Sequence, residues 1–161
     1  MAQRSRLSTG LSGVAGEYFV AAELSRRGYI ASITLRNTRG VDILASNADA
    51  TKSVGIQVKT SQASRPSWIL NQKVEHSIGG ALAENLFFVF VRLNELGAPA
   101  YHIVSRHVVA EFCRANHKRW LNTPGRKGQP HKDTAMRTFE DPASKYLDDW
   151  ESLGLGTKVV T

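Results

Sequence analysis

A continuous apolar run at residues 86–93, LFFVFVRL, constrains the fold of this chain more than any other feature. A strand without alternation of apolar and polar residues is typical of the centre of a sheet whose faces are both covered. After a turn from Asn94 to Pro99, residues 100–104 (AYHIV) are predicted to form the next strand. No apolar run approaches the roughly 18 residues that a membrane span requires. We therefore expect a sheet covered on both faces and no membrane partner.

Further strands are predicted on the N-terminal side of this run. Residues 29–35 (YIASITL) alternate in the way that indicates a strand. Residues 41–45 (VDILA) and 54–60 (VGIQVKT) are joined by a short polar link, which favours an antiparallel hairpin. Residues 68–70 (WIL) indicate another short strand, whereas residues 71–85 are ambiguous.

Two long helices are predicted to accompany these strands. Residues 12–27 form the first helix, with Ser12 as its N-terminal cap and Gly28 as the residue that ends it. The second helix is capped by Ser105 and runs to about Leu121, with an apolar stripe along one side. The strands therefore lie between two helices in the chain.

The C-terminal part is predicted to contain a loop and a closing helix. Residues 122–137 are rich in Gly, Pro and cations, which indicates a basic loop. Asp141 and Pro142 form a cap and first-turn pair for a short helix over about residues 142–153. The full order predicts one α/β (α+β) domain over residues 1–161, with a mixed central sheet of four to five strands flanked by helices.

The composition favours a polyanion as partner. The chain has 161 residues with 21 Lys and Arg and 14 Asp and Glu, for a formal net charge of +7. Residues 1–40 hold six arginines against two glutamates, and residues 101–140 hold eight basic residues against three acidic ones. Residues 41–100 are neutral. Basic segments on both sides of a neutral middle are typical of proteins that bind nucleic acid.

Other classes are excluded by what the sequence lacks. Cys113 is the sole cysteine, which excludes an internal disulfide framework and a cysteine-based zinc site. The five histidines show no metal-ligand spacing, and no Walker, dinucleotide-binding or α/β-hydrolase motif occurs. The N-terminus has arginines without an apolar stretch behind them, unlike a secretory signal. We expect a cytoplasmic protein.

Three polar side chains are predicted to converge at the hairpin. Gln57 and Lys59 share one face of the 54–60 strand, about 6.6 Å apart along it. A lysine within an apolar strand is costly unless it has a partner or faces a wet cleft. If the 41–45 strand pairs with this one, Asp42 lies beside both residues. A carboxylate, an amide oxygen and a lysine in one cleft suit a hard cation such as Mg²⁺.

A second acid is predicted to lie on the apolar side of the first helix. Glu17 is followed at helical spacing by the apolar residues Val20 and Leu24. A carboxylate on an apolar stripe is costly unless it has a partner or a function. Glu17 is therefore the fourth candidate for the same site.

The stretches GEYFVAAELSRRGY, RGVDILA and IQVKTS, within residues 13–61, resemble the PD-(D/E)XK nuclease superfamily. The similarity is to its Holliday-junction-resolvase-like and restriction-endonuclease-like branches. It implies a restriction-endonuclease-like core and a Mg²⁺- or Mn²⁺-dependent endonuclease that hydrolyses phosphodiester bonds of DNA. Two positions depart from the pattern, because Val41 stands where a proline is usual and Gln57 where an acid is usual.

The resemblance also implies a catalytic or metal-binding role for each residue. Asp42 would ligate the metal, Gln57 would hold the second ligand position, and the carbonyl of Val58 would be a further ligand. Glu17 would bind the metal directly or through water. Lys59 would orient or activate the attacking water. A neutral amide oxygen binds a metal more weakly than a carboxylate does.

Each of these residues also has a purely structural interpretation. Asp42 is alternatively a strand-end acid paired with Arg39 or Lys59, and Lys59 an edge-strand lysine. Glu17 is alternatively a buried ion-pair partner, and Gln57 a plain hydrogen-bonding side chain. The alternative function is a non-catalytic nucleic-acid-binding or interaction module that retains the nuclease fold.

DNA is the expected partner, RNA is the alternative, and double-strand cutting would require a homodimer. Phosphate contacts supply affinity without sequence specificity, and the candidates lie on the second helix and in the basic loop. They are Arg114, Lys118, Arg119, Arg126, Lys127, Lys132 and Arg137. The tryptophans are interpreted as packing anchors, namely Trp68, Trp120 and Trp150. Trp68 is the best candidate among them for stacking on a base.

Overall fold

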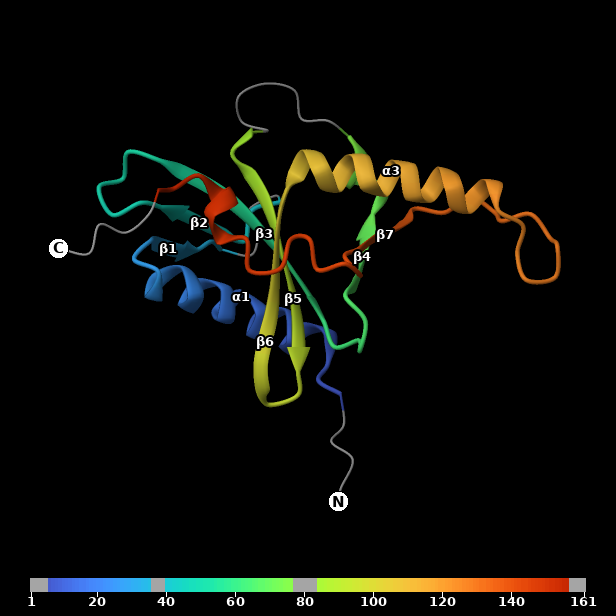
Figure 1. Cartoon of the computed structure of the whole chain (residues 1–161). Helices are drawn as coiled ribbons and strands as arrows, with labels where there is room; N and C mark the ends of the chain where they lie inside the picture. Colours follow the sequence, from blue (N-terminus) through green and yellow to red (C-terminus); the bar gives the residue numbers. More distant parts are fainter. Residues whose placement is uncertain (1–5, 36–39, 77–83, 157–161) are drawn as a thin grey trace, which may run out of the picture.

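The computed structural model describes residues 6–35, 40–76 and 84–156 (Figure 1). Its centre is a five-stranded sheet in the order β1-β2-β3-β5-β6, in which β3 and β5 run parallel and the other neighbours antiparallel. The strands are β1 (Ile30–Ile33), β2 (Ile43–Ser46), β3 (Ser53–Ser61), β5 (Leu86–Asn94) and β6 (Gly97–Ser105). The predicted fold class and the antiparallel pairing of β2 with β3 are confirmed.

The apolar run forms β5 and lies inside the sheet, as predicted, between β3 and β6. Its side chains alternate between two separate cores. Val89 and Val91 face the core on the α1 side, whereas Phe88 and Phe90 face the core on the α3 side. All four residues are almost completely excluded from solvent. The absence of polar residues from Phe87 to Val91 follows from this burial on both faces.

Helix α1 (Thr9–Arg26) covers the first face of the sheet (Figure 1). It begins before the predicted residue 12, because the hydroxyl of Ser8 accepts a hydrogen bond from the first turn at 3.3 Å. Ser12, the predicted cap, is instead buried within the helix. The predicted end is confirmed, since Gly28 has a φ of 86°, which glycine adopts at little cost.

Gly16 allows α1 to approach β3 closely. A Cβ atom at this position would lie 1.9 Å from the Oγ1 of Thr60 on β3. No side chain larger than hydrogen fits there unless the Thr60 side chain, the helix or the strand moves. The contact determines the distance between α1 and the sheet, and therefore the position of Glu17, the next residue along the helix.

Helix α3 (Arg106–Asn122) covers the opposite face, together with a second, two-stranded sheet (Figure 1). That sheet pairs β4 with β7, and a short 3₁₀ helix, η1, follows β4. The bounds are β4 (Ser67–Asn71), η1 (Gln72–Glu75) and β7 (Met136–Glu140). α3 and its cap Ser105 match the prediction. β7 was not predicted, and it begins at Met136, within the last two residues of the expected basic loop. No helix of the described chain is long and apolar enough to cross a membrane.

The predicted closing helix over residues 142–153 is wrong. Ser144 and Asp148 have positive φ angles of 54° and 53°, which a continuous helix does not allow. The segment instead follows the edge strand β6, to which backbone hydrogen bonds of 2.8 and 2.9 Å attach it. A single 3₁₀ turn, η2 (Trp150–Leu153), is its helical part. Pairing with β6 satisfies backbone groups of an edge strand that a helix would leave unpaired.

A buried pair of side chains anchors this C-terminal segment to the sheet. Nδ1 of His102 on β6 lies 2.7 Å from Oδ2 of Asp141, and both side chains are almost completely buried. Burial raises the pKa of the Asp141 carboxyl, but hydrogen bonds from two backbone N–H groups and from His102 outweigh it and lower the pKa overall. Asp141 therefore caps a turn and not the start of a helix. The segment that follows this turn is bonded to β6.

Candidate active site

Asp42 lies at the start of β2, beside the middle of β3. Its backbone N–H donates to the carbonyl oxygen of Ile56 at 2.8 Å, which brings the chain against β3 one residue before β2 begins. Its carboxylate Oδ2 accepts a hydrogen bond from the backbone N–H of Val58 at 2.7 Å. Val58 lies between Gln57 and Lys59 in the chain. The structure therefore places the carboxylate against the segment that carries the other two polar candidates.

Gln57 and Lys59 line a hollow on the α3 side of β3. Its volume is about 490 Å³. Gln57 lies opposite Phe88 in the pairing of β3 with β5, and Phe88 forms part of the floor of the hollow. Lys73 and Arg106 also line it. We call this space the basic hollow.

Glu17 and Asp42 line a different hollow, on the α1 side, with a volume of about 280 Å³. Both residues are half-buried, and Thr34 and the backbone of α1 around Gly13 complete the lining. We call this space the acidic hollow. The two acids line one hollow, the amide and the lysine line the other, and the hydrogen bond from Asp42 to β3 connects them.

The potential metal ligands around Asp42 are all oxygen atoms, which suits a hard divalent cation. Asp42 and Glu17 supply carboxylates. Gln57 supplies an amide oxygen, and Val58 supplies a backbone carbonyl. Among the described residues, no three or more His, Cys, Asp and Glu side chains form a group that would hold a metal. A metal here would depend on amide, carbonyl and water ligands, and Mg²⁺ characteristically keeps several waters.

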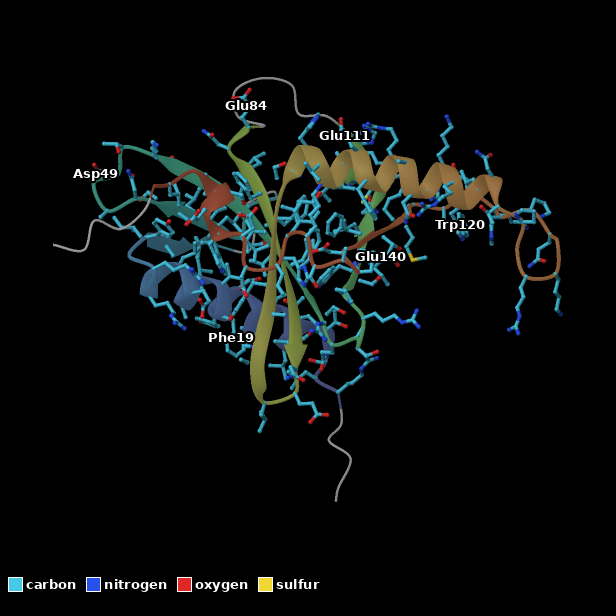
Figure 2. All side chains as sticks on the ribbon, in the orientation of Figure 1. Phe19, Asp49, Glu84, Glu111, Trp120 and Glu140 are labelled. Atoms are coloured by element: carbon cyan, nitrogen blue, oxygen red, sulfur yellow. The ribbon has the colours of Figure 1, made fainter. Side chains whose placement is uncertain are left out.

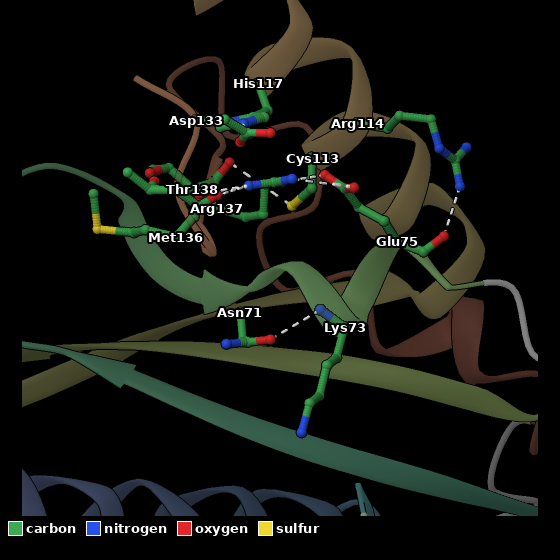
Figure 3. Close-up of polar contacts among 11 residues, drawn as sticks. Asn71, Lys73, Glu75, Cys113, Arg114, His117, Asp133, Met136, Arg137 and Thr138 are labelled. Carbon is green, nitrogen blue, oxygen red and sulfur yellow. Dashed lines mark hydrogen bonds and ion pairs between the residues drawn. The ribbon is translucent and has the colours of Figure 1, made fainter. Parts of the chain in front are cut away.

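The structure adds two cations that the sequence analysis did not single out. Lys73 on η1 extends toward the central sheet (Figure 3), and Arg106 is the first residue of α3. The Arg106 guanidinium lies over the ring of Phe88 at 6.0 Å, and burial lowers its pKa. Neither residue belongs to the 13–61 stretch that carries the resemblance. No spacing in the sequence signals that they lie near Lys59.

The predicted phosphate-binding cations are exposed, with the exception of Arg137. The Arg137 side chain is 7% exposed and forms an ion pair with the carboxylate of Glu75 (Figure 3). Its guanidinium already has an intramolecular partner, so the prediction that Arg137 contacts phosphate at the surface is corrected. Arg114 is exposed, although its guanidinium donates to the carbonyl of Glu75 at 2.6 Å. The other exposed cations of the set are Lys118, Arg119, Arg126, Lys127 and Lys132.

Trp120 differs from its predicted role as a packing anchor. Trp68 and Trp150 are buried, whereas Trp120 is 37% exposed at the end of α3 that lies away from the central sheet (Figure 2). Its ring stacks with the rings of His117 and His131, at centroid distances of 5.5 and 4.1 Å. Trp68, the expected candidate for base stacking, is part of the α3-side core. The exposed aromatic surface therefore lies beside the basic loop and not at the candidate site.

The fold and the site define an α/β protein with a five-stranded mixed sheet and a polar site beside β3. A search of solved structures finds similarity to Hjc, a Holliday junction resolvase from the archaeal hyperthermophile Archaeoglobus fulgidus. The similarity covers 91% of each chain, with 14% sequence identity and a TM-score of 0.46. No protein-family model matches the chain, and no curated protein sequence matches it. At this identity and score, the similarity does not by itself assign an activity.

Proposed function

We propose that the chain is a metal-dependent endonuclease that hydrolyses phosphodiester bonds of DNA. The hydrogen bond from the N–H of Val58 to the Asp42 carboxylate carries the proposal, because it couples the acid to the strand that bears Gln57 and Lys59. The resemblance to the PD-(D/E)XK superfamily gives these same positions to the metal ligands and the catalytic lysine. A mixed sheet with a helix on each face agrees with that assignment.

Each residue of the site has a distinct role in this proposal. Oxygen ligands for Mg²⁺ or Mn²⁺ come from Asp42, Gln57, Val58 and Glu17. When bound, the metal neutralises phosphate charge and lowers the pKa of water. Lys59 stabilises the negative charge that develops on the phosphate oxygens during attack. Because Gln57 is a neutral ligand, we expect the enzyme to require a high metal concentration.

The charge of the surface supports a nucleic acid as substrate. α3 and the loop after it present exposed cations, which bind backbone phosphates without reading base sequence. DNA is proposed because the resemblance is to DNA nucleases, and RNA is the substrate to test beside it. Cutting both strands of a duplex in one encounter requires two active sites, so linear product that forms without prior build-up of open-circular DNA would indicate a homodimer.

Nicking of supercoiled plasmid in the presence of Mg²⁺ or Mn²⁺ tests the proposal. The wild type should produce open-circular DNA, and Asp42→Asn should not. Asp49→Asn is the matched control, because Asp49 is an exposed aspartate on the link between β2 and β3 (Figure 2) and should be dispensable. A single-stranded RNA in parallel reactions distinguishes DNA from RNA as the substrate.

A non-catalytic DNA-binding module is the second candidate function. Gln57 is the observation that favours it, since an amide in place of a carboxylate weakens the metal site. Gel retardation of DNA without any cutting, with equal retardation by Asp42→Asn, would replace the nuclease with this alternative.

A further inference from the structure

Three cations from three separate elements line the basic hollow. They are Lys59 on β3, Lys73 on η1 and Arg106 on α3. Among the described residues, no carboxylate lines this hollow and none of the three cations forms an ion pair. Like charges in one space repel each other, and a bound anion removes that repulsion. The charge of the hollow therefore indicates an anionic ligand.

Arg106 is suited to holding such an anion. Its side chain is partly buried, and its guanidinium lies over the ring of Phe88. A cation with less water around it attracts an anion more strongly, because screening is weaker. Arg106 also begins α3, a 17-residue helix whose first N–H groups add partial positive charge.

The size and the floor of the hollow indicate more than a phosphate ion. Leu70, Val74 and Phe88 form an apolar floor that belongs to the core on the α3 side. A volume of about 490 Å³ lies within the range of about 300–1,000 Å³ that is typical of sites for small organic ligands. An apolar floor with cations around it suits a nucleotide, whose sugar and base contact the floor and whose phosphate contacts the cations.

We propose that the basic hollow binds the nucleotide next to the cleaved phosphodiester, with Lys73 and Arg106 as the ligands of its phosphate. The inference rests on the proposed function, because Lys59, the proposed catalytic lysine, lines the same hollow. Lys73 and Arg106 are substrate-binding residues in this assignment. They place the strand so that the adjoining phosphate reaches Lys59 and Asp42.

Binding of a short fluorescent DNA duplex in EDTA tests the inference without any cleavage. Lys73→Gln and Arg106→Gln should each weaken binding roughly tenfold, as expected for loss of a charged phosphate contact. Each should also reduce the slope of log affinity against log salt by about 0.9. Lys52→Gln is the matched control, because Lys52 is an exposed lysine that lines a different hollow. Equal binding by all three variants would overturn the inference.

Further measurements separate a binding defect from a folding defect and a nucleotide from a free phosphate. Lys73 is exposed, so its replacement leaves the core intact, and Lys73→Glu should weaken binding more than Lys73→Gln does. Thermal unfolding checks Arg106→Gln. A deoxynucleoside 5′-monophosphate should compete with the duplex better than inorganic phosphate in the wild type, and Arg106→Gln should weaken both competitors, because it removes a ligand of the phosphate that they share. Equal competition by the two anions would overturn the nucleotide assignment.

Failure of this inference and failure of the proposed function give different results. If the wild type nicks plasmid and the Lys73 and Arg106 variants bind and nick like Lys52→Gln, the subsite is overturned and the nuclease stands. If those variants lose affinity while no protein nicks, the phosphate site is supported and hydrolysis is overturned. In an active enzyme, both variants should raise KM while kcat stays within about threefold, because they remove binding made equally in ground and transition states.

Discussion

The two hollows that flank β3 carry charges of opposite sign. The acidic hollow has Glu17 and Asp42 and no basic side chain among its described lining residues. The basic hollow has Lys59, Lys73 and Arg106 and no acid among its own. One strand thus separates a side that suits a divalent cation from a side that suits a phosphate. The comparison teaches that carboxylates and cations are separated by β3, with the carboxylates on the α1 side and the cations on the α3 side.

The alternation of side chains along β3 explains this separation. Val58 faces the core under α1, whereas Gln57 and Lys59 face the α3 side. Asp42 connects the two sides, because its carboxylate bonds to the backbone N–H of Val58. In the proposed function, a phosphodiester bound beside Val58 of β3 has the two acids on one side and the three cations on the other.

Asp42→Asn is expected to have the largest effect. It removes one of the two carboxylates of the acidic hollow while it keeps the shape of the side chain. Nicking should fall at least about 1,000-fold, which corresponds to about 4 kcal/mol of lost transition-state stabilisation. Single-turnover rates at saturating Mn²⁺ measure it, with Asp49→Asn as control. Activity within tenfold of the wild type would show that the acidic hollow is not the metal side.

Lys59→Met should have the next largest effect. The variant keeps the apolar stem and removes the ammonium group that stabilises charge in the transition state, so the nicking rate should fall about 100-fold. Affinity for DNA in EDTA should change by less than about tenfold, as for one lost phosphate contact. Lys52→Met serves as control. A loss of affinity with an unchanged rate would make Lys59 a binding residue like Lys73.

Gln57→Glu places an acid in the basic hollow, next in sequence to Val58, whose N–H binds the Asp42 carboxylate. A carboxylate holds Mg²⁺ more strongly than an amide does, so half-maximal nicking should need about tenfold less metal. The new charge faces the basic hollow and should weaken metal-free DNA binding about threefold. Gln72→Glu, on exposed η1, should change neither quantity. An unchanged metal requirement in Gln57→Glu would remove Gln57 from the ligand set.

Gly16→Ala tests the close approach of α1, the helix that carries Glu17, to β3, and it should affect stability. The added methyl group would overlap Thr60, so the free energy of unfolding should fall by about 1–3 kcal/mol. Gly13→Ala is the matched control on the same helix, because a Cβ there meets nothing within 4 Å. It should be neutral or stabilising by up to about 1 kcal/mol. Urea unfolding measures both, and equal values would show that the close approach at Gly16 is not required.

The part of the fold that carries Glu17, Asp42, Gln57 and Lys59 was largely predictable. Strand alternation, the polar link and the glycine after α1 are signals that involve residues close in sequence. The pairing of β2 with β3 was confirmed by the structure. The roles of the four side chains remain predictions, because the resemblance supplies them and the described geometry places them in two hollows.

The C-terminal third was predicted less well, because its structure depends on partners that are distant in the sequence. Asp141 and Pro142 have the pattern of a helix start, but Asp141 is held by His102 and the chain that follows pairs with β6. Arg137 lies in a stretch rich in cations, which is typical of a surface, but its charge is paired with that of Glu75. In each case the deciding partner lies more than 35 residues away in the chain, and a local pattern contains no information about it.

By itself, the sequence determined the central strand, the two long helices and the alternation that puts Gln57 and Lys59 on one face of β3. These properties depend on neighbours within a few residues, whose spacing defines which face each side chain occupies. Only the tertiary structure decided that Lys73 and Arg106 join Lys59 and that the acids line a separate hollow. Those outcomes depend on how α1, η1 and α3 pack on the sheet, and packing between distant segments has no local signature.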